Sequence, residues 1–392
     1  MTTTLILGGG FGGMTCARAL RAALPAEHKI IVVDRAPLFF VGATKTWLML
    51  GEKTPEEITR ARGALLPPGV DLVQADVTRI DASTREVHTT AGSFKGDHLV
   101  IALGSEQEIG AVPGLPESAH SFYGFLDALQ LRSALQTFPG GRIVLLIPRV
   151  PFPCPPGPYE GMLLIHDQLV RRGLREKSPL DVWTVEKLPM ATAGTEMGEA
   201  VVGLLRERGI GFHPQMKVSR VEPARKAVRF EDGSEALFDL LIAVPPHRVP
   251  RVIVDSWLAK PDAWIPVDPK TLAVKSPTAA PNVFAIGDVA SVPLPGRWFP
   301  DVPLMLPKAG VMAAAEGEVV AANIAAIVAG KPPAAAYDGT GACYIEVGGK
   351  RAMRGEGMFF EMPHPVMRHA SPSESLFRDK VAWVDGMLVP RR

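Results

Sequence analysis

Cysteine is the residue type in this chain with the clearest potential for nucleophilic or redox chemistry. The three cysteines are Cys16, Cys154 and Cys343. Cys154 lies in the proline-rich segment PRVPFPCPPGPYEG, just before an amphipathic pattern that predicts a helix from Tyr159 to Arg172. A thiol held rigidly near a helix N-terminus favours its reactive thiolate form. Cys343 lies in an expected short strand, GACYIEVGG. Sequence separation leaves open whether these two thiols meet.

Four other side chains deserve a prediction. Cys16 lies in an apolar helical pattern and is expected to be core filler. Glu160 follows the proline-rich cysteine by six residues and is either a proton acceptor or an ordinary charge at a helix start. Lys308 begins the small-residue segment 308–328, where an ammonium and a helix end would stabilise negative charge. His247 is expected to be a solvated loop histidine at a strand end.

The first 34 residues predict the element that positions a ligand. An apolar run ends at Gly8, Gly10 and Gly13 in the spacing G-x-G-x-x-G, and a helical pattern and a second apolar strand ending at Asp34 follow. The glycines permit a tight turn and close backbone approach, the helix N-terminus offers N–H groups to a pyrophosphate, and Asp34 can accept from a ribose hydroxyl. This order of elements predicts a dinucleotide site.

A second copy of the same design follows, with its loop altered. The strand DHLVIALG, which contains Ala102 and Gly104, returns as FDLLIAVPP over residues 238–246, and RIVLLI over 142–147 corresponds to the first strand. In place of the glycine loop the second copy has prolines, which lack N–H donors and stiffen the backbone. A nicotinamide dinucleotide is therefore not expected there.

Further along, NVFAIGDVA delivers Gly287 and Asp288 to a turn, where such an acid can bond the ribityl portion of a flavin. The expected fold is α/β, with tandem Rossmann-like dinucleotide-binding domains like those of disulfide reductases and a small C-terminal α+β segment. The expected parts are 1–105 (flavin-binding, first part), 106–250 (second Rossmann-like domain with a degenerate nicotinamide site), 251–335 (flavin-binding, second part) and 336–392 (C-terminal segment).

Composition limits the partners. Lys and Arg number 42 against 41 Asp and Glu, with no basic block, which disfavours nucleic acid. The cysteine spacing encodes no metal site. The first expected strand begins close to Met1 and no apolar run reaches about 18 residues, which predicts a cytoplasmic protein without a spanning helix. The apolar stretches 358–367 and 381–389 leave core, homodimer contact and a membrane face open.

Motifs along nearly the whole chain resemble those of the sulfide:quinone oxidoreductase and flavocytochrome c sulfide dehydrogenase family. The matching phrases are GGGFGG, ALG, CPPGPYE, AIGD, PKAG and CY, and CPPGPYE is the most specific of them. The resemblance implies FAD bound through the N-terminal and Asp288 regions, with Cys154 and Cys343 as a redox pair beside it. Members that tether FAD do so through a cysteine near the present Val41, which this chain lacks, so the FAD is expected to be non-covalent.

The implied activity is oxidation of sulfide to polysulfide or sulfur, with electrons passed to a quinone. One alternative is the flavoprotein subunit of a flavocytochrome c, which would pass electrons to a c-type cytochrome. Others are an enzyme like type II NADH dehydrogenase and a non-catalytic flavin-binding protein. The expected location is the cytoplasm, either free or peripheral on the inner membrane face.

Overall fold

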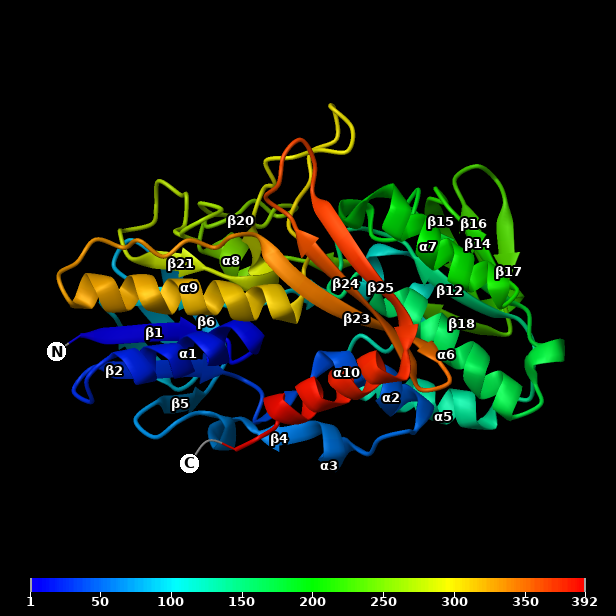
Figure 1. Cartoon of the computed structure of the whole chain (residues 1–392), viewed down its shortest axis with the longest axis horizontal. Coiled ribbons are helices and arrows are strands. Elements are labelled where there is room, and N and C mark those ends of the chain that lie inside the picture. The colour runs from blue at the N-terminus through cyan, green and yellow to red at the C-terminus, as the bar shows by residue number, and fades with distance from the viewer. Residues whose placement is uncertain (1, 391–392) are drawn as a thin grey trace.

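The computed structural model describes residues 2–390, and its larger sheets are two five-stranded parallel sheets and three three-stranded antiparallel sheets (Figure 1). The first parallel sheet has the order β21-β9-β1-β2-β5. Its strands are β1 (Thr3–Leu7), β2 (Lys29–Asp34), β5 (Asp71–Gln74), β9 (His98–Ile101) and β21 (Val283–Ala285). Apart from the edge strand β5, each strand is apolar along most of its length, as expected for a sheet covered on both faces.

The second parallel sheet repeats this arrangement in the order β11-β18-β12-β13-β14. Its strands are β11 (Ala119–His120), β12 (Ile143–Ile147), β13 (Leu180–Thr184), β14 (Ile210–His213) and β18 (Leu240–Ala243). In the first sheet β1 pairs with β2 on one side and with β9 on the other. In the second sheet β12 pairs in the same way with β13 and β18. The expected tandem Rossmann-like fold is confirmed.

Each sheet has helices packed against it, and short helices lie in the connections. The helices before the C-terminal segment are α1 (Phe11–Ala23), α2 (Lys45–Leu50), α3 (Pro55–Ile58), α4 (Leu115–Ser118), α5 (Phe125–Thr137), α6 (Gly157–Arg171), α7 (Gly194–Glu207), α8 (Arg251–Asp255) and α9 (Gly310–Val328). Helix α9 begins two residues after Lys308, later than the sequence pattern suggested.

Helices α1 and α9 approach each other closely through glycines. A Cβ at Gly12 would lie 2.9 Å from the carbonyl oxygen of Ala313, and a Cβ at Gly317 would lie 2.5 Å from that of Gly12. By length and composition alone, α9 is the one helix among residues 2–390 that could cross a membrane. It carries the buried polar side chains Glu316 and Asn323, and it packs on α1, as the core helix of a folded domain does.

The C-terminal segment forms an antiparallel sheet with the order β23-β24-β25, followed by a helix. These elements are β23 (Thr340–Gly348), β24 (Arg351–Met358), β25 (Val366–Ser373) and α10 (Glu374–Met387). Figure 1 shows the long strands crossing the molecule between the α9 half and the α6 half. Strand β23 contacts both α9 and α6, so it connects the two halves.

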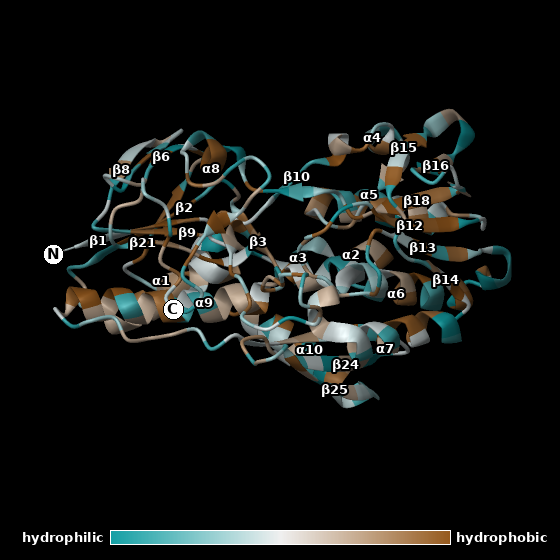
Figure 2. Ribbon diagram, turned by 90° about the horizontal axis from the view of Figure 1, so that it is seen from above, coloured by the Kyte–Doolittle hydropathy of each residue, from teal (hydrophilic) through white to brown (hydrophobic). Residues whose placement is uncertain are grey.

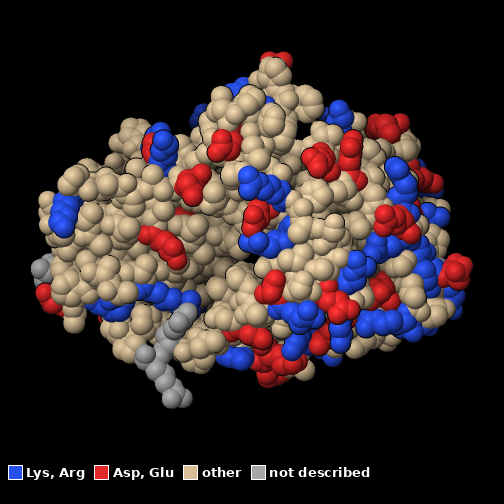
Figure 3. Space-filling model, in the orientation of Figure 1, with Lys and Arg blue, Asp and Glu red and all other residues tan. Residues whose placement is uncertain are grey.

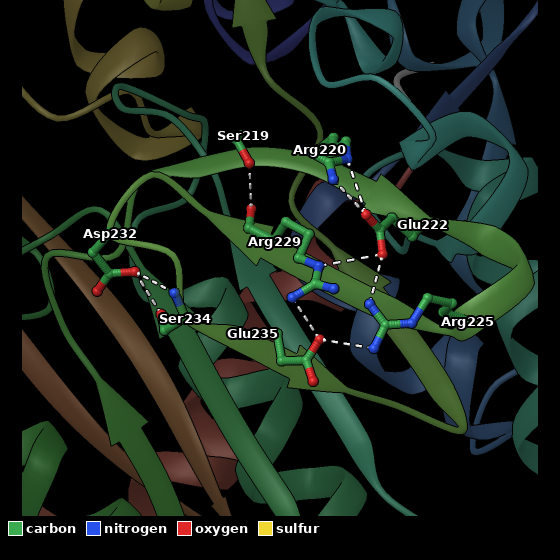
Figure 4. Close-up of polar contacts among 8 residues, drawn as sticks. All are labelled: Ser219, Arg220, Glu222, Arg225, Arg229, Asp232, Ser234 and Glu235. Carbon is green, nitrogen blue, oxygen red and sulfur yellow. Dashed lines mark hydrogen bonds and ion pairs between the residues drawn. The ribbon is translucent and has the colours of Figure 1, made fainter.

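Each Rossmann-like unit also carries a three-stranded antiparallel sheet before its last strand. These are β6 (Val77–Asp81), β7 (Glu86–Thr89) and β8 (Gly92–Lys95) in the first, and β15 (Val218–Glu222), β16 (Ala227–Phe230) and β17 (Glu235–Leu237) in the second. On the second, arginines and glutamates alternate in a surface ion-pair network around Glu222 and Glu235 (Figure 4).

The remaining strands are short and pair locally. They are β3 (Leu38–Phe40) with β4 (Thr59–Ala61), β10 (Glu106–Gln107) with β19 (His247–Arg248), and β20 (Ile265–Pro266) with β22 (Ala290–Ser291). Apolar residues concentrate along the central strands of both parallel sheets (Figure 2). On the face shown in Figure 3, charged side chains gather over the half that carries α6 and α7, and few lie over the half that carries α1 and α9.

Candidate active site

The turn between β1 and α1 has the geometry that its glycines require. Gly8 adopts a φ of +100°, and a Cβ there would lie 2.2 Å from the carbonyl oxygen of Ala102. A Cβ on Gly13 would lie 1.9 Å from the carbonyl oxygen of Gly8. In contrast, a Cβ on Gly10, the residue that precedes α1, would meet nothing within 4 Å. Open space therefore lies in front of an uncapped helix N-terminus, which suits a pyrophosphate.

Asp34 ends β2 beside this turn, as expected. Its carboxylate accepts hydrogen bonds from the amides of Gly9 at 2.7 Å and Ala36 at 2.8 Å, and it lies 3.4 Å from the Arg62 guanidinium. Arg62 also donates to the carbonyl oxygens of Gly9, Ala36 and Leu38. The sequence prediction did not include Arg62. Its position at the turn leaves the Asp34 carboxylate partly exposed and next to the place of an adenosine ribose.

The other predicted cofactor residues lie at the ends of neighbouring strands. Ala102 and Gly104 follow β9, and Gly287 and Asp288 follow β21, so with the glycine turn after β1 they occupy one edge of the sheet. A Cβ on Gly104 would meet nothing within 4 Å. Ligands of such sheets bind at the carboxyl ends of the strands. The open positions at Gly10 and Gly104 fit an extended dinucleotide such as FAD.

Lys308 and Asp288 meet in a buried polar cluster to which α9 adds Glu316. The Lys308 ammonium donates to the carbonyl oxygens of Asp288 and Ala290 and lies 3.5 Å from the centre of the Trp264 ring. Burial lowers the pKa of Lys308 to about 8, and Asp288 and Glu316 oppose that change. Burial raises the pKa of Glu316 to about 8 and also raises the pKa of Asp288.

Glu316 was missed by the sequence prediction, although it and Glu318 are unusual as acids in a helix of mostly small and apolar residues. Its carboxylate accepts a hydrogen bond from the Gly287 amide at 2.5 Å. It therefore fixes the turn that delivers Asp288 to the edge of the sheet.

The corresponding turn of the second unit holds Cys154 in place of glycines. Cys154 adopts a φ of +57°, a left-handed conformation that is uncommon for a residue with a side chain. Its amide donates to the carbonyl oxygen of Lys308 at 2.7 Å, and its own carbonyl accepts from the Gly157 amide at 2.8 Å. The first bond ties the proline-rich turn directly to the segment that precedes α9. Cys154 is partly exposed and is a free thiol.

The acid at the end of β13, where a nucleotide ribose would be bound in this fold, is turned to the interior. Glu186 accepts from the Tyr159 hydroxyl at 2.5 Å and from the Met190 amide at 3.0 Å. Burial raises the pKa of Glu186 to about 7. Because Glu186 is also buried, unlike Asp34, its carboxylate is not presented to a ribose.

Glu160 lies in a second buried network, which links α6 to the C-terminal segment. Its carboxylate accepts from the Thr46 hydroxyl at 3.0 Å, the Lys380 ammonium at 3.1 Å and the Glu346 amide at 3.0 Å. Lys380 also donates to the Glu346 carboxylate at 2.6 Å, as does the Trp47 indole at 2.6 Å. The sequence prediction missed Glu346 and Lys380. Proton transfer by Glu160 stays a prediction.

Cys343 lies on β23, three residues before Glu346, and is also a free thiol. Burial, together with the charges of Cys154 and Glu160, raises the pKa of Cys343 to about 12, and Lys380 opposes that rise. The pairing of Cys154 with Cys343 stays a prediction. The third thiol, Cys16, is 0% exposed among the apolar side chains of the first unit. The structure places Cys16 away from this site.

Two residues near Cys154 were not predicted as the structure has them. Lys45, the first residue of α2, is 5% exposed, and its ammonium lies 3.6 Å from the centre of the Tyr123 ring. His247 is buried, and desolvation lowers its pKa to about 4. The expectation of a solvated loop histidine is therefore wrong, because the Tyr123 ring packs on this strand end.

Among residues 2–390 no group of three or more His, Cys, Asp or Glu side chains could hold a metal ion. The site is thus built from two thiols, two buried lysine-containing clusters and an open edge of the first sheet. This chemistry suits two-electron transfer between a sulfur centre and a flavin.

Comparison with known proteins agrees with this reading. Residues 2–145 match the family model described as "Pyridine nucleotide-disulphide oxidoreductase", and residues 128–245 match "Sulfide dehydrogenase [flavocytochrome c] flavoprotein chain, central". The mitochondrial sulfide:quinone oxidoreductase of Mus musculus is 26% identical over 373 residues, which cover 92% of this chain and 78% of the mouse protein.

The sulfide-quinone reductase of Aquifex aeolicus is 27% identical over 371 residues, which cover 92% of this chain and 83% of that protein. The solved structure of the sulfide:quinone oxidoreductase of Aquifex aeolicus superposes with a TM-score of 0.84 at 23% identity, covering 98% of this chain and 90% of that one. By these matches the chain is similar to sulfide:quinone oxidoreductases over 92% of its length, and it is an FAD-binding oxidoreductase.

Proposed function

We propose that this protein oxidises sulfide to polysulfide or sulfur with its Cys154 and Cys343 thiols and passes the electrons through non-covalent FAD to a quinone. The observation that carries this proposal is the hydrogen bond from the Cys154 amide to the Lys308 carbonyl. It fixes a thiol-bearing turn of the second unit against the segment that leads into α9 in the first. The similarity to a sulfide:quinone oxidoreductase and to a sulfide-quinone reductase supports the same substrate and acceptor.

The proposed cysteine chemistry is a thiol–disulfide exchange. With the pair oxidised to a disulfide, hydrosulfide attacks one of its sulfurs, the S–S bond breaks and a new S–S bond forms to the incoming sulfur. One cysteine then carries a persulfide and the other leaves as a thiolate, so no net electrons have yet left the sulfur atoms. Bound FAD supplies the two-electron acceptor for the oxidation that follows.

Several residues would hold the cofactor. Gly8, Gly10 and Gly13 would accommodate its pyrophosphate, Asp34 its ribose, and Asp288 its ribityl chain, with Ala102, Gly104 and Gly287 allowing close approach. The Lys308 ammonium is bonded to the backbone carbonyls of Asp288 and Ala290. We propose that Lys308 acts on the cofactor mainly by shaping this turn and by adding positive potential near the start of α9.

Two alternatives make different use of the same fold. A type II NADH dehydrogenase needs a nucleotide at the second turn, and the proline-rich backbone and the internal bonding of Glu186 disfavour one. A flavoprotein subunit that reduces a c-type cytochrome would share the sulfur chemistry and differ in the acceptor. A non-catalytic flavin-binding protein would not respond to sulfide.

The C-terminal part of the chain supports a proposal about location. Met362, at 65% exposure, and Val389, at 51%, expose apolar side chains in this segment. We propose that it makes a peripheral contact with the inner face of a membrane, where a quinone is available. The homodimer stays a prediction.

The test uses the purified flavoprotein under anaerobic conditions. Addition of sulfide should remove the flavin absorbance band, and decylubiquinone should restore it faster than cytochrome c does. Faster recovery with cytochrome c would favour the alternative acceptor. No loss of absorbance with sulfide, in protein that contains FAD, would refute sulfide oxidation, and rapid loss with NADH would favour the NADH dehydrogenase.

A further inference from the structure

A buried polar cluster next to Cys154 has no part in the chemistry proposed so far. We define it by the ends of Lys45, Tyr123 and His247, which come from α2, from the segment between β11 and α5, and from β19. The Tyr123 ring contacts both of its neighbours. The Lys45 ammonium lies 3.6 Å from the ring centre, and the His247 ring centre lies 5.6 Å from it.

Lys45 borders the same space as the thiol of the proline-rich turn. A Cβ added to Gly157 would lie 3.2 Å from the Cys154 Sγ and 3.5 Å from the Lys45 Nζ. The sulfur and the ammonium therefore flank one small space above the first residue of α6. Only a glycine leaves that space free.

Several polar atoms of this cluster lack hydrogen-bond partners. Within the described part of the chain the Lys45 ammonium makes no hydrogen bond or ion pair, and its charge is met by the Tyr123 ring. The Tyr123 hydroxyl and the His247 Nδ1 are buried without a partner among residues 2–390. A buried charge or polar group without a partner is costly, so such groups point to a ligand that completes them.

The charged member of this cluster, the Lys45 ammonium, favours an anionic ligand. Burial lowers the pKa of Lys45, while the neighbouring Cys154 and Glu160 oppose that change because they favour its charged form. Burial keeps His247 neutral near pH 7. An ammonium and a phenol hydroxyl can both donate hydrogen bonds to an anion.

We propose that Lys45, with the Tyr123 hydroxyl, forms a binding site for a small sulfur anion beside Cys154. On the proposed function, this anion is hydrosulfide on arrival or the terminal sulfur of a persulfide on Cys154. Lys45 holds the charge of this anion within reach of the Cys154 sulfur.

The test compares two alkylating reagents, one anionic and one neutral, on the reduced FAD-containing protein. Iodoacetate and iodoacetamide modify the same thiol, and mass spectrometry of the Cys154 peptide gives each rate. In Lys45→Met the ratio of the iodoacetate rate to the iodoacetamide rate should fall about tenfold, because only the anionic reagent uses the site. Lys45→Arg should keep the ratio within about twofold of wild type.

Lys53→Met is the matched control, because Lys53 is a partly exposed lysine just after the same helix and pairs with Glu57 at 2.9 Å. It should leave the ratio unchanged. In wild-type protein, which needs no substitution to fold, thiocyanate should protect Cys154 from iodoacetamide more than urea does at the same concentration. An unchanged ratio in folded Lys45→Met, or no protection by thiocyanate, would overturn the anion site.

The outcome is separable from that of the proposed function. If the ratio falls and wild-type flavin does not respond to sulfide, the anion site stands and sulfide oxidation fails. If wild-type flavin responds to sulfide and the ratio does not change, sulfide oxidation stands and Lys45 has no part in anion binding.

Discussion

The two Rossmann-like units share a strand order and differ at their first turn. After β1 the chain turns through Gly8 to Gly13 and leaves open space before α1, whereas after β12 it turns through prolines and Cys154 into α6. The space before α1 suits a nucleotide. The start of α6 is instead covered by the C-terminal segment, since Glu160 bonds to the Glu346 amide and to Lys380.

The same fold therefore holds a cofactor at one first turn and a reactive side chain at the other. A parallel sheet presents the ends of its strands at one edge whatever the turn contains. Glycines there expose backbone N–H groups to a cofactor, and prolines there remove donors and hold a side chain instead. The second unit has in this way exchanged a nucleotide site for a fixed thiol.

The first prediction concerns a substitution in the first turn. Gly13→Ala would place a Cβ 1.9 Å from the Gly8 carbonyl oxygen, and the backbone would have to move. Such overpacking costs ~1–3 kcal/mol, which corresponds to about a tenfold or greater loss of FAD affinity. Flavin content after purification and a fluorescence titration with FAD measure this change.

The control for that substitution is Gly203→Ala on α7, where a Cβ would meet nothing within 4 Å. It should bind FAD as wild type does. Normal FAD affinity in Gly13→Ala would contradict the assignment of the first turn to the pyrophosphate.

The next prediction concerns the proposed pair of thiols, Cys154 and Cys343. Cys343→Ser should abolish loss of the flavin absorbance on addition of sulfide while FAD stays bound, because the hydroxyl cannot form the disulfide. Stopped-flow absorbance measures the rate. Cys16→Ala is the control, since Cys16 is buried in the first unit, and it should retain the reaction. An unaltered rate in Cys343→Ser would exclude Cys343 from the redox step.

A third substitution removes the buried lysine that links the C-terminal segment to α6. Lys380→Met would leave the buried Glu160 and Glu346 carboxylates without their shared cation, and breaking a buried pair in this way costs ~3–5 kcal/mol. Equilibrium unfolding in urea should show a loss of this size in the free energy of unfolding. Adding Glu346→Gln to Lys380→Met should recover part of it, because one carboxylate is then neutral.

The surface network of Figure 4 provides the comparison for this substitution. Arg225 pairs with Glu222 and Glu235 on the second unit, but these side chains are partly exposed to water. Arg225→Ala should therefore change the stability little. Equal effects of Lys380→Met and Arg225→Ala would mean that the buried network does not hold the C-terminal segment on α6.

The last prediction concerns Glu316 in the first unit and its contribution to the pH dependence of stability. Glu316 has an ordinary pKa of 4.5, and burial raises it to about 8 in the folded protein. A raised folded pKa gives stability that is complete below pH 4.5 and is lost as the pH rises through about 8. Glu316→Gln should remove that part of the loss.

Thermal unfolding of the FAD-containing protein at pH 5 and at pH 8 measures this effect. Wild type should lose more in Tm between the two than Glu316→Gln does. The second unit offers the comparison, because Glu186 is also raised, to about 7, and Glu186→Gln should flatten the profile at lower pH. An identical profile in Glu316→Gln and wild type would show that Glu316 is ionised in the folded protein.

Local patterns predicted much of this architecture. The glycine spacing, the repeated strand phrases and the acid at Asp34 specified two sheets and the position of the first turn, since each pattern lies within one supersecondary unit. The helix after the PKAG phrase was expected to start at Lys308 and begins at Gly310. The domain boundaries stay a prediction.

Contacts between distant segments could not be predicted in this way. Lys380 pairs with Glu160, 220 residues away in the chain, and no local periodicity reports such a pairing. His247 was misjudged because its burial depends on Tyr123, which belongs to a different segment of the sheet edge. Lys45 and Glu316 are charged residues within mostly apolar segments, which is visible in the sequence. The local pattern does not show which residues they contact.

The central claim is that Cys154 and Cys343 form one redox centre at the altered second turn. The most direct measurement is peptide mapping of the FAD-containing protein after mild oxidation, with alkylation of the remaining thiols. The account predicts a peptide in which Cys154 is linked to Cys343, directly or through added sulfur, and an alkylated Cys16. If Cys154 and Cys343 are both recovered as separate alkylated peptides from fully oxidised, FAD-containing protein, the account is wrong.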